Sequence, residues 1–181
     1  MDSDVKNMIR FGEDSVCEFK SIRIPGKRVV EPEVKDVADE IAAAANAAGA
    51  VFLFGINDKT KEVEGIPEDK LEIAEAWLRN ICNDSVKPAV AATIRKIAVC
   101  DSAGIERCVI RVDVPKSLFV HESPHGYFYR SGSSPVTNSF AHACRGVPSR
   151  NVSLMLRGHV SWTSAGRGSL SFFLRLGVFR A

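Results

Sequence analysis

Residues 50–56, AVFLFGI, form an uninterrupted apolar run. Gly49 precedes this run, and the polar pair Asn57-Asp58 follows it. A strand that is covered on both faces has this continuous apolar character, because neither face meets water. The run therefore predicts the central strand of a buried sheet.

Amphipathic helices are predicted before and after this strand. The first follows Pro32, and its apolar residues recur at helical spacing from Val34 to Ala48, where Gly49 ends the helix. Its alanine-rich face predicts a close approach to a sheet. The second helix opens at Pro67 and carries these apolar residues on one face: Leu71, Ala74, Trp77, Leu78 and Ile81.

Further strands are predicted on either side of these helices. Cys17 and Phe19 alternate with their neighbours at the two-residue period of a half-buried strand, which starts near Val16. After the central run, a polar turn leads to a short strand at residues 62–64, and the two are predicted to form a hairpin. The later strands are predicted at residues 90–100, 105–114 and 127–130.

The resulting order is β-α-β-β-α-β-β-β. It predicts an α/β fold of the mixed α+β kind, with a central mixed sheet and two main helices. At 181 residues and 45% hydrophobic composition, the chain is long enough for one domain with a substantial core, but too short for two of ordinary size.

Membrane insertion and disulfide bonding are not expected. No stretch approaches the roughly 18 to 20 apolar residues that span a bilayer, and the first residues are acidic where a signal peptide is basic. The five cysteines are odd in number and scattered, with no spacing that suits a zinc site. These features predict a cytoplasmic protein with reduced, mostly buried thiols and no membrane partner.

The charge is distributed unevenly along the chain. Residues 1–122 hold all 22 acidic residues against 17 Lys and Arg, whereas residues 123–181 hold seven Arg, no Lys and no acid. Surfaces usually intersperse both signs. We therefore expect a domain over residues 1–137 and a basic, acid-free tail over residues 138–181. One hypothesis is that this tail arises from a shifted reading frame and is not native.

Three acids are candidate ligands for a hard cation. Glu13, Glu18 and Asp58 offer carboxylate oxygens, which Mg²⁺ and Mn²⁺ prefer. Asp58 lies at the end of the central strand, where sheet geometry can bring it beside the first strand. The alternative is that Glu13 and Asp58 are turn residues and that Glu18 is a solvated strand position.

A basic segment follows the first strand. Lys20, Arg23, Lys27 and Arg28 occur with no acid between Glu18 and Glu31. Such a loop can lie along a phosphate backbone even in an acidic domain, because local potential is what matters. It can equally be an ordinary solvated loop.

A second cationic position lies near the end of the predicted domain. Arg130 is followed by small residues, including Ser133, whose amides and hydroxyls can hold a phosphate. The alternative is a simple strand end and turn.

Several familiar catalytic motifs are absent or misplaced. Residues 121–125 match the letters of HExxH, but that motif needs a helix, and Pro124 disfavours one. No P-loop and no GxGxxG segment after a strand is present. A zinc protease and a nucleotide-binding enzyme of the usual kinds are therefore not predicted.

Taken together, these segments resemble the Schlafen AlbA-type (AlbA_2) DNA-binding domain family. Residues 13–20 resemble its ExxxxEFK opening, residues 41–50 its I-x-A-x-A-N-x-x-G-G segment, and residues 54–58 its hGhxD strand end. Residues 64–66 and 129–134 are similar to the G-I that follows and to the closing YxRxGSS. Ala50 stands in place of the second glycine, and the basic, acid-free tail stands where the resemblance implies a helical segment after the closing motif.

The resemblance implies a nucleic-acid-binding domain of a prokaryotic transcriptional regulator or defence-type protein, acting on DNA or RNA. In that case Asn46 orders the strand-helix junction, and these residues contact phosphates: Lys20, Arg23, Lys27, Arg28, Arg130 and Ser133. This hypothesis needs no cofactor.

Two alternatives remain open. In animal Schlafens the equivalents of Glu13, Glu18 and Asp58 form a metal-dependent endoribonuclease site for structured RNA such as tRNA. By that resemblance, these acids hold Mg²⁺ or Mn²⁺, while Lys20 or Lys59 steadies developing charge. The other alternative is a protein-interaction module, including a homodimer, in which the acids are inert.

Overall fold

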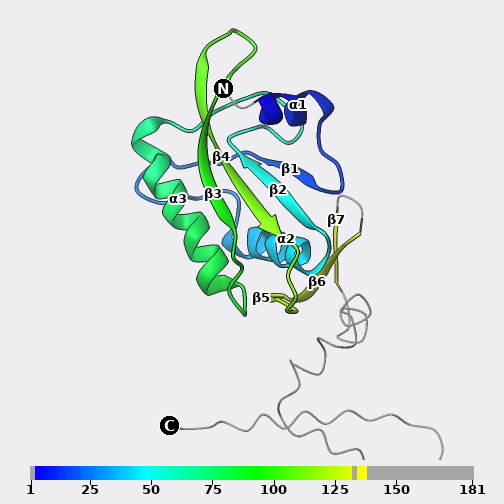
Figure 1. The fold of residues 1–181 in the computed structure, drawn as a ribbon. Coiled ribbons are helices and arrows are strands. Elements are labelled where there is room, and N and C mark those ends of the chain that lie inside the picture. The colour runs from blue at the N-terminus through cyan, green and yellow to red at the C-terminus, as the bar shows by residue number, and fades with distance from the viewer. Residues whose placement is uncertain (1–2, 132–133, 138–181) are drawn as a thin grey trace, which may run out of the picture. The chain divides into compact units, whose positions relative to one another are not determined.

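A computed structural model describes residues 3–131 and 134–137 of the chain. Helices and strands alternate in the first part of this range, and five strands follow (Figure 1). The helices are α1 (Ser3–Phe11), α2 (Val34–Asn46) and α3 (Leu71–Asn80), the last between a 3-10 turn (Glu68–Lys70) and a π-helical turn (Ile81–Ser85). The strands are β1 (Cys17–Lys20), β2 (Gly49–Phe54), β3 (Thr93–Cys100), β4 (Glu106–Pro115), β5 (Glu122–Ser123), β6 (Gly126–Ser131) and β7 (Ser134–Thr137).

The main sheet has four strands in the order β1-β2-β4-β3. β1 pairs with β2 in parallel, and the other two pairings are antiparallel. Phe52 lies opposite Glu18 on one side and opposite Val112 on the other. The apolar run is thus a central strand of a mixed sheet, and the predicted fold class is confirmed.

Both faces of β2 are buried, as its continuous apolar sequence predicts. Successive strand residues point to opposite faces. Phe52 and Phe54 pack in a cluster with residues of α2 and α3, whereas Leu53 packs in a second cluster with Val5 of α1. The sheet therefore has a helical layer on each face.

The helix α2 is enclosed on more than one side. It contacts β2 and β4 of the main sheet, and also β5, β6 and β7, which form a second, three-stranded antiparallel sheet. Figure 1 shows α2 with β5 and β6 beside it. Residues 37–45 are accordingly buried apart from the half-buried Glu40. The alanines permit this close packing because they add little bulk between the two sheets.

The predicted hairpin after the central strand forms only as a short chain reversal beyond β2, and the strand predicted at residues 62–64 is wrong. Ile56 and Val63 form an isolated antiparallel bridge, the Asn57 N–H donates to the Glu62 carbonyl at 2.9 Å, and the Gly65 N–H donates to the Gly55 carbonyl at 2.8 Å. The physical reason is that both edges of β2 are already occupied, by β1 and by β4. The short strand predicted there has no free edge on which to extend.

Three elements were not predicted. α1 carries Val5, Met8 and Ile9 at helical spacing, a short signal that was available in the sequence. β5 and β7 are two and four residues long, too short for a reliable period. The tail expected over residues 138–181 lies outside the described residues, so the domain division stays a prediction. In the part of the chain that the structure covers, no helix is long and apolar enough to cross a membrane.

Candidate nucleic-acid interface and inner ion network

The predicted cationic residues fall into an exposed set and a buried set. The exposed set lies in the segment between β1 and α2, which turns back on itself. Arg23 donates its backbone N–H to the Glu31 carbonyl at 2.9 Å, and the Val30 N–H donates to the Arg23 carbonyl at 2.9 Å. These bonds close residues 23–31 into a protruding loop, which we call the basic finger.

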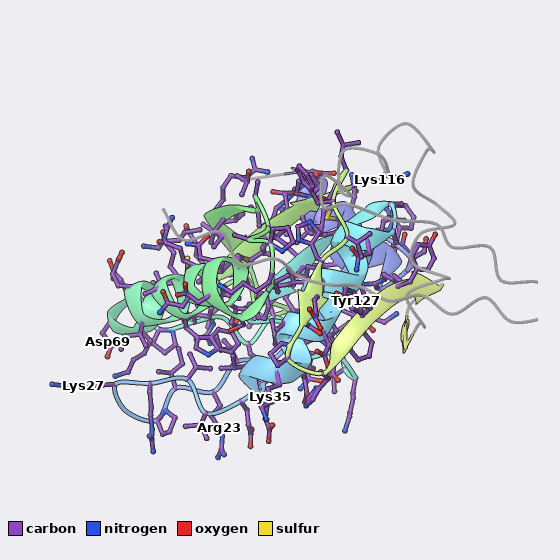
Figure 2. All side chains as sticks on the ribbon, turned by 90° about the horizontal axis from the view of Figure 1, so that it is seen from below. Arg23, Lys27, Lys35, Asp69, Lys116 and Tyr127 are labelled. Atoms are coloured by element: carbon purple, nitrogen blue, oxygen red, sulfur yellow. The ribbon has the colours of Figure 1, made fainter. Side chains whose placement is uncertain are left out.

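Lys27 and Arg28 lie at the exposed end of the basic finger. In Figure 2 the Lys27 side chain extends outward, and Arg23 and Lys35 project from the same side of the domain. Arg23 pairs with Glu31 at 2.9 Å, with side chains 62% and 63% exposed. Such an exposed ion pair contributes little to the stability of the fold, so Arg23 can readily exchange Glu31 for another anion.

The buried set lies on the α2 side of β1. Because strand residues alternate, Cys17 and Phe19 face the α1 layer, whereas Glu18 and Lys20 face the opposite way. Glu18 is therefore not a solvated strand position. The ammonium of Lys20 lies 2.8 Å from Glu40 Oε1 on α2 and 3.3 Å from Glu18 Oε1.

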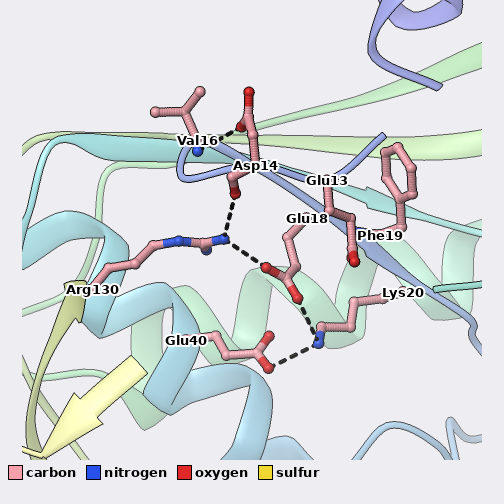
Figure 3. Close-up of polar contacts among 8 residues, drawn as sticks. All are labelled: Glu13, Asp14, Val16, Glu18, Phe19, Lys20, Glu40 and Arg130. Carbon is pink, nitrogen blue, oxygen red and sulfur yellow. Dashed lines mark hydrogen bonds and ion pairs between the residues drawn. The ribbon is translucent and has the colours of Figure 1, made fainter. Parts of the chain in front are cut away.

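Arg130 on β6 completes this cluster (Figure 3). Its guanidinium lies 2.6 Å from Glu18 Oε2 and donates to the Asp14 carbonyl at 3.3 Å. The guanidinium carbon also lies 6.0 Å from the centre of the Phe52 ring, within cation–π range. We call Glu18, Lys20, Glu40 and Arg130 the inner ion network.

Burial sets the electrostatics of the inner ion network. It raises the pKa of Glu40, although the Lys20 ammonium works against this shift. The Glu40 Oε2 atom is buried and has no hydrogen-bond partner among the described residues. Burial works to lower the pKa of Lys20, but the ion pairs with Glu40 and Glu18 outweigh it, and that pKa is raised. Lys20 therefore stays charged, and both Lys20 and Arg130 pair with acids of their own chain.

The predicted phosphate contacts divide accordingly. Arg23, Lys27 and Arg28 are exposed to a ligand, whereas the side chains of Lys20 and Arg130 are only 20% and 3% exposed. Ser133 lies outside the described residues. Lys20 and Arg130 are also both paired with Glu18, so neither offers an unpaired charge to a phosphate.

Glu13 has a backbone role at the edge of the sheet. Its Oε1 accepts the Phe19 N–H at 2.8 Å, while Asp14 Oδ1 accepts the Val16 N–H at 2.8 Å. β1 is an edge strand, so these carboxylates satisfy groups that no neighbouring strand pairs. Figure 3 shows Glu13 beside Glu18.

Asp58 and Lys59 lie in the exposed turn after β2. Asn57 Oδ1 accepts the N–H groups of Lys59 and Thr60, both at 3.0 Å, which fixes this turn. The sequence placed Asp58 correctly near a strand end, but the side chain that fixes this turn is that of Asn57.

The three candidate metal ligands do not gather around one position. Within residues 3–131, the group of His, Cys, Asp and Glu ligand atoms that lie within 4.8 Å of one another is Asp36, Asp39 and His125. Glu13, Glu18 and Asp58 form no such group, and both Glu18 oxygens face cations of the chain. In this arrangement they do not fit Mg²⁺ or Mn²⁺, and catalytic roles for them, Lys20 and Lys59 stay predictions.

The Asn46 side chain holds two parts of the chain against α2, the residue just before β5 and the strand β6. Its Nδ2 donates to the carbonyls of His121 and Phe128, both at 2.8 Å, and its Oδ1 accepts the His121 N–H at 2.7 Å. The sequence placed Asn46 at a strand-helix junction. The structure shows that it holds a more distant part of the chain.

Sequence reasoning missed Glu40 and Asp39. Glu40 lies three residues after Val37 and four before Ala44, so it sits in the apolar stripe of α2. An acid at such a position needs a buried partner, which was a usable signal. Asp39 is 8% exposed, and its partners lie more than 80 residues away.

The family model described as Schlafen, AlbA_2 matches residues 13–137. The chain belongs to this family. The match confirms the resemblance drawn from the opening, middle and closing motifs, and this family suggests a nucleic-acid-binding domain. It includes β1, the basic finger and β6, so the whole inner ion network lies inside the family domain.

A solved structure has a similar fold. It is the crystal structure of the DIP2311 protein from Corynebacterium diphtheriae, with a TM-score of 0.52 and 21% sequence identity. The match covers 78% of this chain but only 30% of that protein. At this identity the likeness concerns the fold alone.

Proposed function

We propose that the protein binds the phosphate backbone of nucleic acid through the basic finger. The observation that carries this proposal is the exposure of Lys27 and Arg28, which make no ion pair among the residues that the structure describes. Several other exposed cations face acids, for example Arg95 with Asp113, whereas Lys27 and Arg28 follow each other on one loop and face no acid of the described residues. The finger therefore presents positive charge that its own chain does not neutralise.

Phosphate binding needs local charge rather than a basic protein. Cations that contact phosphates release counterions from the nucleic acid, and this term acts irrespective of sequence. Arg23 and Lys35 lie on the same side of the domain as Lys27 (Figure 2). A polyanion on that side gains contacts from the finger and the start of α2, while the Arg23–Glu31 pair exchanges at little cost.

The inner ion network supports the finger in this proposal. Lys20 is the last residue of β1, and the finger begins three residues later. By holding Lys20 to Glu40, the network fixes one end of the finger to α2, whose first residue Val34 follows its other end. Because the ends of the finger are already fixed, the finger loses less conformational freedom when it binds, and binding costs less free energy.

Phosphodiester groups are common to DNA and RNA, so the test compares both. Labelled 30-mers of double-stranded DNA, single-stranded DNA and double-stranded RNA, together with tRNA, are titrated with the full chain in 50 mM salt. A preference for duplex DNA would support the finer hypothesis of a transcriptional regulator. A preference for RNA would favour a role on transcripts or in defence.

The deciding variant removes two charges from the finger, Lys27→Gln with Arg28→Gln. We expect its affinity to fall by roughly tenfold or more, because each phosphate contact contributes to binding at low salt. The matched control, Lys6→Gln with Lys116→Gln, removes the same charge elsewhere, and Lys116 lies on the opposite side of the view in Figure 2. No binding to any of the nucleic acids, or equal losses in both variants, would refute the proposal.

A further inference from the structure

Asp36, Asp39 and His125 bring three metal-ligating side chains together outside the interface described above. Asp36 and Asp39 are three residues apart on α2, a spacing that places both on one side of the helix. His125 comes from the turn between β5 and β6. One ligand atom of each lies within 4.8 Å of the other two.

Asp39 is the centre of this group. His125 Nδ1 lies 2.7 Å from Asp39 Oδ2, and the Ser123 hydroxyl donates to Asp39 Oδ1 at 2.5 Å. Asp39 is 8% exposed, whereas Asp36 and His125 are exposed. The group is thus anchored by a buried carboxylate, and its outer side is open to solvent.

The charge of this group is not balanced by the described part of the chain. No Lys or Arg forms an ion pair with Asp36 or Asp39 among residues 3–131, and Ser123 is neutral. A buried carboxylate without a cationic partner is costly, and a second carboxylate nearby adds repulsion. Both oxygens of Asp39 have partners, Ser123 and His125, but no Lys or Arg among residues 3–131 pairs with the two carboxylates, so a divalent cation suits the space between them.

We propose that Asp36, Asp39 and His125 bind one divalent transition-metal ion of the Zn²⁺ or Mn²⁺ class. Imidazole nitrogen suits Zn²⁺ and carboxylate oxygen suits Mn²⁺, so a set of two carboxylates and one imidazole fits this class, whereas Mg²⁺ and Ca²⁺ favour oxygen ligands alone. Ser123 is then a positioning residue, because its hydroxyl orients the Asp39 carboxylate. Water fills the remaining coordination positions on the exposed side.

This site goes beyond the proposed binding of nucleic acid. It joins α2 to the β5–β6 hairpin, whereas the basic finger lies between β1 and α2. A bound ion cross-links two elements that are separated by more than 80 residues, and the unfolded chain lacks this preformed site. Metal binding is therefore expected to stabilise the folded state.

The experiment measures ion binding directly. The full chain is stripped with EDTA, dialysed and titrated with Zn²⁺, Mn²⁺ and Mg²⁺ by calorimetry, and its Tm is recorded with and without each ion. We expect one Zn²⁺ or Mn²⁺ per chain to depend on this group, with a higher Tm and a weaker response to Mg²⁺. Asp36→Asn and His125→Gln replace exposed residues, so both variants should fold, which circular dichroism checks.

Each of these variants should bind the ion at least about tenfold more weakly, since even the loss of a residue that only orients a ligand has that effect. Glu33→Gln removes an exposed acid just before α2 and should bind as the wild type does. A variant with His142→Gln and His159→Gln tests whether histidines of the tail hold the ion, and it too should retain binding.

Two results would overturn this inference. One is the absence of Zn²⁺ and Mn²⁺ binding by the full chain. The other is unchanged binding in Asp36→Asn and His125→Gln, which would place the ion elsewhere. Nucleic-acid affinity is measured in separate titrations, so failure of either proposal leaves the other testable.

Discussion

The Glu18 carboxylate lies 2.6 Å from the Arg130 guanidinium, although 112 positions separate the two residues in the sequence. Glu18 belongs to β1 of the main sheet, and Arg130 belongs to β6, the middle strand of the second sheet. Their side chains are 14% and 3% exposed. This ion pair therefore connects the main sheet directly to the second sheet, beside α2, which contacts both sheets.

Breaking that pair should destabilise the domain. Arg130→Met leaves Glu18 partly buried with Lys20 as its remaining cation, and we expect the free energy of unfolding to fall by about 3 kcal/mol. The double variant Glu18→Gln with Arg130→Met should recover part of this loss, because no unpaired charge is left. Urea denaturation of the single and double variants measures both effects.

The exposed Arg23–Glu31 pair provides the control. Arg23→Met should change the free energy of unfolding by less than about 1 kcal/mol, since exposed pairs contribute little. An Arg130→Met variant as stable as the wild type would show that the Glu18–Arg130 pair does not hold the sheets together.

The contrast between Phe19 and Glu18 explains what the sequence could predict. Alternation along β1 indicated correctly that Phe19 is buried, because periodicity reports which side of a strand is apolar. It could not indicate that α2 covers the other side, where Glu18 meets Arg130. Such a partner depends on the tertiary arrangement of segments more than 100 residues apart.

The same limit applies to the second sheet. β2 and α2 were predictable from long apolar patterns, and the family from its ordered motifs. Asp39 was not, because its partners Ser123 and His125 lie on a hairpin whose first strand has two residues. A strand of two residues is too short to show an alternating pattern. A polar side chain on a helix does not reveal which loop lies against it.

Asn46 should contribute more to the stability of the domain than most polar residues do. Asn46→Ala leaves the His121 N–H and the carbonyls of His121 and Phe128 without their partner. We expect a loss of about 3 kcal/mol in the free energy of unfolding, given the usual penalty for unpaired buried groups. Hydrogen exchange should also accelerate at the His121 amide.

Asn46→Asp distinguishes these hydrogen bonds from simple packing. It keeps the acceptor for His121 but turns a negative oxygen toward two carbonyls, so it should be no more stable than Asn46→Ala. Asn80→Ala, at the exposed end of α3, is the control and should have little effect. A fully stable Asn46→Asp variant would contradict the bonding pattern.

His121 should make stability depend on pH. Burial lowers its pKa below the ordinary 6.5, although its hydrogen bond to the Pro88 carbonyl works in the opposite direction. The unfolded chain therefore takes up a proton below pH 6.5 while the folded chain resists it, so the free energy of unfolding falls as the pH drops from 7 to 5. Urea midpoints at pH 7, 6 and 5 measure this slope.

Replacement of the histidines separates their contributions. His121→Asn can still donate to the Pro88 carbonyl but does not titrate, so its stability should vary less over this pH range. His142→Gln, in the tail, should keep the wild-type slope. Equal slopes in wild type and His121→Asn would show that His121 is not the responsible group.

Cys17 should be inert in the folded protein. Burial, together with the carboxylates of Asp14, Glu13 and Glu18, raises the pKa of Cys17 to about 12, and burial raises that of Cys82 to about 11. The thiolate is the reactive form. At pH 8, iodoacetamide should label both at least about a hundredfold more slowly than the less buried Cys100.

Mass spectrometry of peptides from the labelled protein reads each site separately. In urea the differences should disappear, because burial and the neighbouring carboxylates no longer act. Rapid labelling of Cys17 in the native protein would mean that the interface between β1 and α1 opens readily, contrary to the buried Phe19 and Val5 beside it.

Salt dependence should show whether Lys27 and Arg28 touch phosphates. For duplex DNA, each phosphate contact adds about 0.9 to the slope of log affinity against log salt concentration. If both residues make such contacts, Lys27→Gln with Arg28→Gln should lower the magnitude of that slope by about 1.8. Titrations between 50 and 200 mM salt give the slope, and Lys6→Gln with Lys116→Gln should leave it unchanged. A weaker affinity with the wild-type slope would mean that the two residues act on the shape of the finger, because only direct phosphate contacts alter the number of released counterions.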